Sequence, residues 1–182
     1  MQSNISRWDD LSQSIYEILL REIKHLDKKE ILEAGSGTGR ISLKLARKGA
    51  KVALLDAVSG AINTSNRIYT KEDTEAILVC GSLLEMPFKD GVFDVVWNAG
   101  VLEHLCEEDI ESALKSMVRV CRRNGLVITL NPFSGAILYR IGKWVAEKRQ
   151  TWSYGHENPV KTLKGHMVKS DVFVVAEYPT AF

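Results

Sequence analysis

Short apolar runs alternate with amphipathic segments along this chain, and their order predicts strands alternating with helices. The apolar runs predict strands at 31–32, 51–56, 75–81, 93–100, 126–132 and 172–178. Apolar residues recur at helical spacing between them, in 41–48, 61–71, 108–122 and 137–146. Alternation of this kind is typical of an α/β fold with a mostly parallel, doubly wound sheet and helices on both faces.

A further amphipathic segment, 8–26, precedes the first strand. Its apolar positions follow helical spacing. Because it comes before the first strand, it cannot belong to the first strand–helix–strand unit. We expect this helix to cover an end or a face of the sheet.

The first apolar run leads directly into Glu33 and three glycines, at 35, 37 and 39, and a helical pattern starts immediately afterwards. Glycine permits positive φ and close approach of a ligand, and the amides at the following helix start face that ligand. A dinucleotide fingerprint would place its third glycine at position 40, which is Arg, and the Gly-Lys-Ser/Thr of a phosphate loop is absent. The spacing therefore disfavours a dinucleotide and also a nucleotide bound by a phosphate loop.

Arg40 stands in the first turn of that helix, where a cation opposes the helix dipole. A partner carboxylate would relieve the conflict, whether Glu33, another acid or a carboxylate of the ligand. Solvent exposure is the alternative.

The second predicted strand ends in a carboxylate, Asp56. A strand-end acid roughly 20 residues after a glycine turn is where a ribose diol is held by two hydrogen bonds. The alternative is that Asp56 caps the next helix, although Ser59 already offers a capping hydroxyl. We favour the ribose role.

Three segments resemble the class I S-adenosylmethionine-dependent methyltransferases. The Glu-x-Gly-x-Gly-x-Gly pattern of 33–39 resembles their motif I, 81–88 resembles their Gly-Asp-Ala-x-x-Leu-Pro-Phe loop at the adenine, and 93–105 resembles their Phe-Asp-x-Val…Leu-Glu-His-Leu segment. These segments occur in the family's order across residues 30–131. The resemblance implies a Rossmann-like sheet, S-adenosyl-L-methionine as cofactor and methyl transfer as the activity.

The resemblance also implies a set of cofactor-binding residues. Glu33 is expected near the amino-acid moiety, Asp56 at the ribose, and Ser82 with the Leu83 amide at the adenine. Ser82 replaces the family's Asp, so its uncharged hydroxyl should bind the adenine amine more weakly. The full predicted set is Glu33, Gly35, Ser36, Gly37, Gly39, Asp56, Ala57, Ser82, Leu83 and Asn98.

His104 is the candidate catalytic base, because it follows the fourth strand and should lie near the methyl-transfer end. A base is needed only when the acceptor keeps its proton at neutral pH. There are three alternatives. His104 could simply form hydrogen bonds within its own helix turn, the base could be His156 or Glu157, or the reaction could use no base. Glu103 adjoins His104 but should point to a different face.

The whole chain, 1–182, is expected to form a single methyltransferase domain. Residues 1–29 form an N-terminal helical cap, 30–131 the cofactor-binding core, and 132–182 a substrate-side insert with the last strand. In the family such a leading segment also closes over the cofactor, so Trp8 and Tyr16 are lid residues or core residues. The family's sheet has seven strands and only six are predicted here, so we expect that the chain is truncated.

Composition narrows the remaining choices. A hydrophobic fraction of 45%, a charged fraction of 26% and a net charge of +1 indicate an ordinary soluble protein with no overall attraction to nucleic acid or membrane. Three scattered cysteines fit reduced thiols in the cytoplasm and no metal motif, and no membrane span or leader is recognisable. Basic residues predominate in 140–169, as a solvated face or as a surface for an anionic acceptor.

A small-molecule acceptor is expected from resemblance to the quinone-biosynthesis type, while the acceptor's identity and the oligomeric state stay open. Two rival functions remain. A catalytically degenerate cofactor-binding or scaffold protein is suggested by Ser82 and the missing strand. An NAD-dependent oxidoreductase would share the layered fold but is disfavoured by Arg40.

Overall fold

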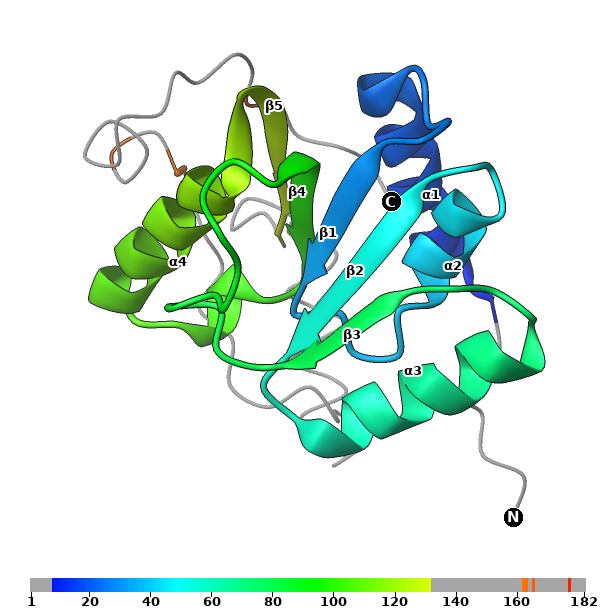
Figure 1. Cartoon of the computed structure of the whole chain (residues 1–182). Coiled ribbons are helices and arrows are strands. Elements are labelled where there is room, and N and C mark those ends of the chain that lie inside the picture. The colour runs from blue at the N-terminus through cyan, green and yellow to red at the C-terminus, as the bar shows by residue number, and fades with distance from the viewer. Residues whose placement is uncertain (1–7, 132–161, 164, 166–176, 178–182) are drawn as a thin grey trace.

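A computed structural model of the protein describes residues 8–131, together with 162, 163, 165 and 177. Its five strands form one parallel sheet in the order β3-β2-β1-β4-β5 (Figure 1). Their bounds are β1 Glu30–Ala34, β2 Lys51–Asp56, β3 Ile77–Cys80, β4 Phe93–Ala99 and β5 Cys121–Leu130. The predicted helix at 137–146, the strand at 172–178 and the question of a seventh strand lie outside the described residues.

Helices cover both faces of the sheet, which confirms the predicted doubly wound α/β class. The helices are α1 Asp10–Ile23, α2 Arg40–Ala46, α3 Ser59–Lys71 and α4 Glu107–Val120, with a short 3-10 helix, η2, at Leu102–His104. In Figure 1, α4 lies on one side of the strands, and α1, α2 and α3 lie on the other.

Alternation along the strands explains this division. Ile31 of β1 packs with Val52 and Leu54 of β2 in the cluster beneath α1 and α2, while the next residue, Leu32, packs with Ala53 in the cluster beneath α4. Successive strand residues point to opposite faces, so strands covered on both faces read as continuous apolar runs. The periodicity that predicted the strands therefore also predicts a two-sided core.

The N-terminal helix α1 is attached to α2 by charged and aromatic contacts. Asp9, its N-cap, accepts a hydrogen bond from the Ser12 amide at 2.7 Å and an ion pair from Arg40 at 3.0 Å. The Lys44 ammonium lies 3.4 Å from the centroid of the Trp8 ring, which meets Tyr16 edge-on. Another acid, Asp9, thus accompanies Arg40, and Trp8 and Tyr16 pack against the core in this state.

The end of α4 differs from the sequence prediction. The helical spacing predicts a helix over 108–122, but α4 ends at Val120 and β5 starts at Cys121. The β4–β5 register passes from Phe93↔Cys121 to Val95↔Leu126, so residues 122–125 form an irregularity inside the strand. Gly125 fits there because an added Cβ would meet the Asp94 carbonyl oxygen at 2.8 Å.

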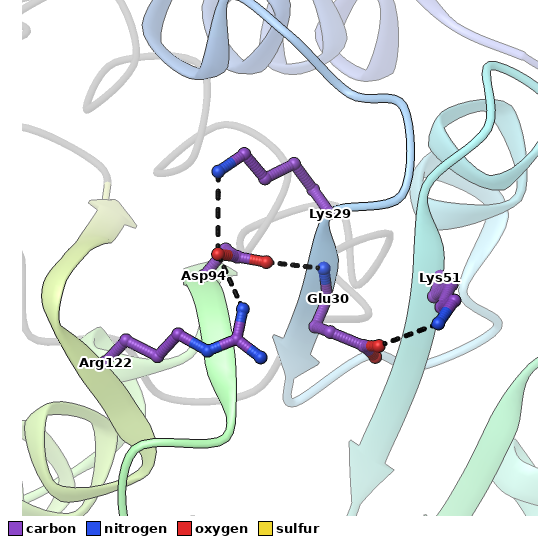
Figure 2. Close-up of polar contacts among 5 residues, drawn as sticks. All are labelled: Lys29, Glu30, Lys51, Asp94 and Arg122. Carbon is purple, nitrogen blue, oxygen red and sulfur yellow. Dashed lines mark hydrogen bonds and ion pairs between the residues drawn. The ribbon is translucent and has the colours of Figure 1, made fainter.

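Charged side chains join the amino ends of four strands, β1, β2, β4 and β5 (Figure 2). The Asp94 carboxylate accepts hydrogen bonds from the Glu30 amide at 2.9 Å and the Arg122 guanidinium at 2.6 Å, and Lys29 Nζ lies 3.5 Å from it. Glu30 in turn pairs with Lys51 at 3.1 Å. We refer to these five residues as the amino-edge network.

Within the part of the chain that the structure describes, no helix combines the length and the apolar character needed to cross a membrane.

Candidate cofactor site at the carboxyl edge of the sheet

The opposite, carboxyl edge of the sheet brings together the residues predicted from the strand ends. Strand β1 lies between β2 and β4, so the order of strands reverses beside it, as predicted. In the register, Glu33 faces Leu54 of β2 and Trp97 of β4, which places the Asp56 and Asn98 strand ends on either side of the glycine turn. Open α/β sheets bind their ligands in the crevice at such a point.

The glycine turn is anchored to β2. The amides of Gly35 and Ser36 both donate to the Leu55 carbonyl, at 2.7 and 3.0 Å. All three glycines have positive φ, and an added Cβ at Gly39 would overlap the Leu54 side chain. An added Cβ at Gly37, in contrast, would meet no atom within 4 Å. The turn is therefore packed against the sheet at one end and leaves open space at Gly37.

Asp56 points at this turn. One carboxylate oxygen accepts a hydrogen bond from the Gly37 amide at 2.7 Å, and the other accepts one from the Val58 amide at 2.8 Å. Val58 is the N-cap residue of α3, so the expectation that Ser59 caps this helix is wrong: Ser59 is its first residue. Each oxygen of an ionised carboxylate can accept a second hydrogen bond, so Asp56 keeps the capacity to hold a diol.

Glu33 is a buried carboxyl group at the end of β1, with a side chain on the α2 face. It is 6% exposed, and its Oε2 atom has no hydrogen-bond partner among the described residues. Burial raises the pKa of Glu33 to about 8, and hydrogen bonding by Ser42 offsets only part of that rise. The charge of Arg40 also lowers the pKa of Glu33, but burial dominates, so the protonated form of the carboxyl is favoured at neutral pH.

Several other buried polar atoms at or beside this edge have no hydrogen-bond partner among the residues that the structure describes. Asn98 is fully buried, and its amide nitrogen reaches only the Met117 sulfur, at 3.6 Å. Within residues 8–131, buried atoms at or beside this edge for which the structure describes no hydrogen-bond partner include Glu33 Oε2, Ser36 Oγ, Trp97 Nε1, Asn98 Oδ1 and Asn131 Oδ1. Each buried polar atom without a hydrogen bond lowers the stability of the fold. A polar ligand that forms a hydrogen bond with such an atom would remove that cost.

The predicted adenine residues follow β3. Ser82 is exposed, and its hydroxyl accepts the Leu84 amide at 3.1 Å, so this oxygen is partly occupied in forming the turn. Leu83 is partly buried against the apolar cluster beneath α4. Cys80, which pairs with Asp56 in the β2–β3 register, brings this loop beside the end of β2.

Val58 is a candidate that sequence reasoning missed. This apolar side chain is 62% exposed although it follows Ala57 and Asp56 at the site. An exposed valine beside a predicted ribose ligand offers an apolar surface for a planar base. The available signal was an apolar residue two positions after the strand-end acid.

His104 ends η2, just after β4, and its side chain is exposed, while the preceding Glu103 is buried. The two side chains thus point in different directions, as predicted. His104 stands on the segment that follows the Asn98 strand end. The alternative bases His156 and Glu157 lie outside the described residues.

Comparisons with known proteins agree with this geometry. The methyltransferase domain family matches residues 32–129. The chain is 33% identical over 144 residues to a ubiquinone biosynthesis O-methyltransferase of Rickettsia akari, covering 78% of this chain and 55% of that protein. The chain spans about half the length of the curated relatives it matches.

Solved structures share the fold. A putative methyltransferase from Bacillus halodurans C-125 has a TM-score of 0.69 at 17% identity, covering 86% of this chain and 68% of that one. Magnesium protoporphyrin IX methyltransferase from Synechocystis PCC 6803, solved with bound SAH, has a TM-score of 0.67 at 18% identity, covering 88% and 70% of the two chains.

Proposed function

This chain belongs to the methyltransferase domain family, and on that premise we propose that its carboxyl edge binds S-adenosylmethionine and that the protein transfers the cofactor's methyl group to a small-molecule acceptor. The observation that carries the proposal is the buried, half-satisfied Glu33 carboxyl beside a glycine turn that Asp56 holds. Family membership supports the class of reaction, and these residues support the proposed location of the binding site.

The residues present fit this cofactor. Its ammonium group suits Glu33, whose Oε2 lacks a partner and whose charge is costly until a cation arrives. Its ribose diol suits the remaining acceptor capacity of Asp56, next to Ala57. Its adenine suits the apolar surface of Val58 and the loop at Ser82 and Leu83. The open space beside Gly37 leaves room for the chain of atoms between these groups.

When bound, the cofactor supplies a sulfonium-activated methyl group, so the protein's task is to align two reacting atoms. Glu33 and the glycine turn fix one end of the cofactor site and Asp56 fixes the middle. Asn98, near the end of β4, is buried with an amide oxygen that has no hydrogen-bond partner within the described part of the chain, and it is proposed to contribute to cofactor binding. His104 is proposed to accept the acceptor's proton during transfer.

A hydroxyl-bearing small molecule is the proposed acceptor class. Support comes from the Rickettsia akari relative, whose name describes an O-methyltransferase of ubiquinone biosynthesis. A hydroxyl keeps its proton at neutral pH, which is the case in which a base such as His104 contributes. We further propose a reducing, cytoplasmic location, because Cys80, Cys106 and Cys121 are all unpaired.

Binding of S-adenosylhomocysteine by calorimetry tests the cofactor proposal, with NAD titrated in parallel. Saturable binding of S-adenosylhomocysteine alone is expected. Binding of NAD alone would establish the oxidoreductase, and S-adenosylhomocysteine binding without turnover on any hydroxylated acceptor would favour the scaffold.

His104→Ala tests the base once an acceptor is found. Turnover should fall by about 10²-fold or more, with cofactor affinity nearly unchanged, because a base acts only in the chemical step. The measurement is the pH dependence of kcat in both proteins. Identical profiles would remove the base role from His104.

A further inference from the structure

Two hydroxyl groups of α3 reach the backbone of the glycine turn. Ser65 and Tyr69 stand one helical turn apart and therefore lie on the same face of α3. The Tyr69 hydroxyl donates to the Gly39 carbonyl at 2.8 Å, and the Ser65 hydroxyl lies 3.1 Å from both the Gly37 carbonyl and the Ala61 carbonyl of its own helix. Both residues are buried, with Tyr69 only 2% exposed. The ring of Tyr69 belongs to the apolar cluster beneath α1 and α2.

These contacts set the direction of two peptide groups. In a trans peptide the carbonyl and the following N–H point in opposite directions. With the Gly37 carbonyl turned to Ser65 and the Gly39 carbonyl turned to Tyr69, the N–H groups of Thr38 and Arg40 point away from α3. A ligand on the far side of the turn then meets amide donors and not carbonyl oxygens.

Because the turn is rich in glycine, its peptide groups need contacts from other residues to keep one orientation. Gly37 and Gly39 both have positive φ, and glycine occupies several backbone regions at similar free energy, so residue type alone does not hold one arrangement. The Gly39 carbonyl also accepts the Leu43 amide at 2.9 Å, the first hydrogen bond of α2. Tyr69 therefore adds a second bond to a carbonyl already held by α2, whereas Ser65 is the side chain that holds the Gly37 carbonyl.

We propose that Ser65 and Tyr69 are positioning residues for cofactor binding: they act through the glycine turn, which they hold in the orientation that a ligand needs. The inference rests on the proposed function, because the turn is the proposed binding element. It assigns α3 a role in cofactor affinity although neither side chain is predicted to touch the cofactor.

The test compares Ser65→Ala, Tyr69→Phe and their double variant with the wild-type chain. Calorimetry with S-adenosylhomocysteine gives affinity, and amide hydrogen exchange of Gly37 to Arg40 reports the turn directly. Thr64→Ala is the matched control, since the hydrogen bonds of the Thr64 hydroxyl among the described residues stay within α3: it donates to the Gly60 carbonyl at 2.9 Å and accepts from the Arg67 guanidinium at 3.2 Å.

Each single variant should weaken S-adenosylhomocysteine binding by about fivefold to tenfold, as expected for loss of one hydrogen bond that preorganises a site. Exchange at the turn should quicken, and Thr64→Ala should change neither quantity. A merely structural role would lower thermal stability while leaving affinity and turn exchange as in wild type, and that result would overturn the inference. If wild-type protein itself does not bind, the proposed function fails, and this inference with it.

Discussion

The two edges of the sheet differ in how many hydrogen-bond donors and cations surround a carboxyl group. At the amino edge, Asp94 has donors on every side, from the Glu30 amide, Arg122 and Lys29 (Figure 2). At the carboxyl edge, the more deeply buried Glu33 has one oxygen, Oε2, with no hydrogen-bond partner in the part of the chain that the structure describes. The first arrangement stabilises the fold, whereas the second is costly unless a ligand completes it.

The pKa values of the two carboxyl groups express this difference. Burial raises the pKa of Asp94, but the Glu30 hydrogen bond and the charges of Arg122 and Lys29 outweigh it and lower the pKa below its ordinary value. For Glu33, burial dominates and the pKa rises to about 8. The amino edge therefore stabilises the ionised form of Asp94, whereas the carboxyl edge disfavours the ionised form of Glu33.

Glu33→Gln should have the largest effect on stability. The folded state keeps the Glu33 proton up to a pKa of about 8, and the unfolded state releases it near 4.5, so stability is greatest below pH 4.5 and declines as the pH rises to about 8. The decline in the free energy of unfolding amounts to roughly 4–5 kcal/mol if the full shift applies. Urea denaturation from pH 5 to 9 should show that the Gln variant lacks this contribution.

The same variant should bind S-adenosylhomocysteine more weakly, because it loses the charge that would pair with the ligand's ammonium. If Glu33→Gln is more stable than wild type above pH 7 and also binds the ligand more weakly, the buried carboxyl of Glu33 serves ligand binding at a cost in stability. Equal pH dependence in the two proteins would contradict the assigned state of Glu33.

Asp56→Ala should weaken S-adenosylhomocysteine binding by about 1–3 kcal/mol, because it removes the proposed diol acceptor and the anchor of the Gly37 amide. Calorimetry on both proteins measures the difference. Unchanged affinity would show that the ribose assignment is wrong.

Asp94→Ala should do the reverse, lowering the free energy of unfolding by about 1–2 kcal/mol with affinity intact. The contribution of the Asp94 charge is present above the unfolded pKa and is lost as the pH falls through the lower folded pKa, so the deficit should become smaller in acid. Denaturation at pH 7 and pH 3 measures this.

Lys51→Ala is the matched control within the amino-edge network. Its ammonium is largely exposed and pairs with Glu30, so its loss should change stability by less than about 0.5 kcal/mol. If Lys51→Ala and Asp94→Ala cost the same, the network around Asp94 has no special weight.

The sequence predicts the strands and the acids at their ends well, because period and spacing are local properties. Glu33 and Asp56 could be identified from the glycine turn and the strand that follows it. The partner of Arg40 could not, since Asp9 lies before α1 and meets Arg40 only after that helix packs on α2. The bonds from Ser65 and Tyr69 to the turn likewise depend on how α3 packs.

The start of β5 illustrates a different limit. Asn124-Gly125 is a typical helix-ending pair, yet here it lies inside a strand irregularity beside Asp94. The same dipeptide suits both settings, and only the register with β4 decides between them. Val58 was missed because an isolated apolar residue in a loop gives no periodic signal.

A crystal structure of the protein grown with S-adenosylhomocysteine tests the central proposal most directly. We predict ligand density across the carboxyl edge, with the ammonium within hydrogen-bond distance of Glu33 and the ribose on Asp56. Density elsewhere, or a carboxyl edge filled by the protein's own side chains while the ligand stays in solution, would contradict the account.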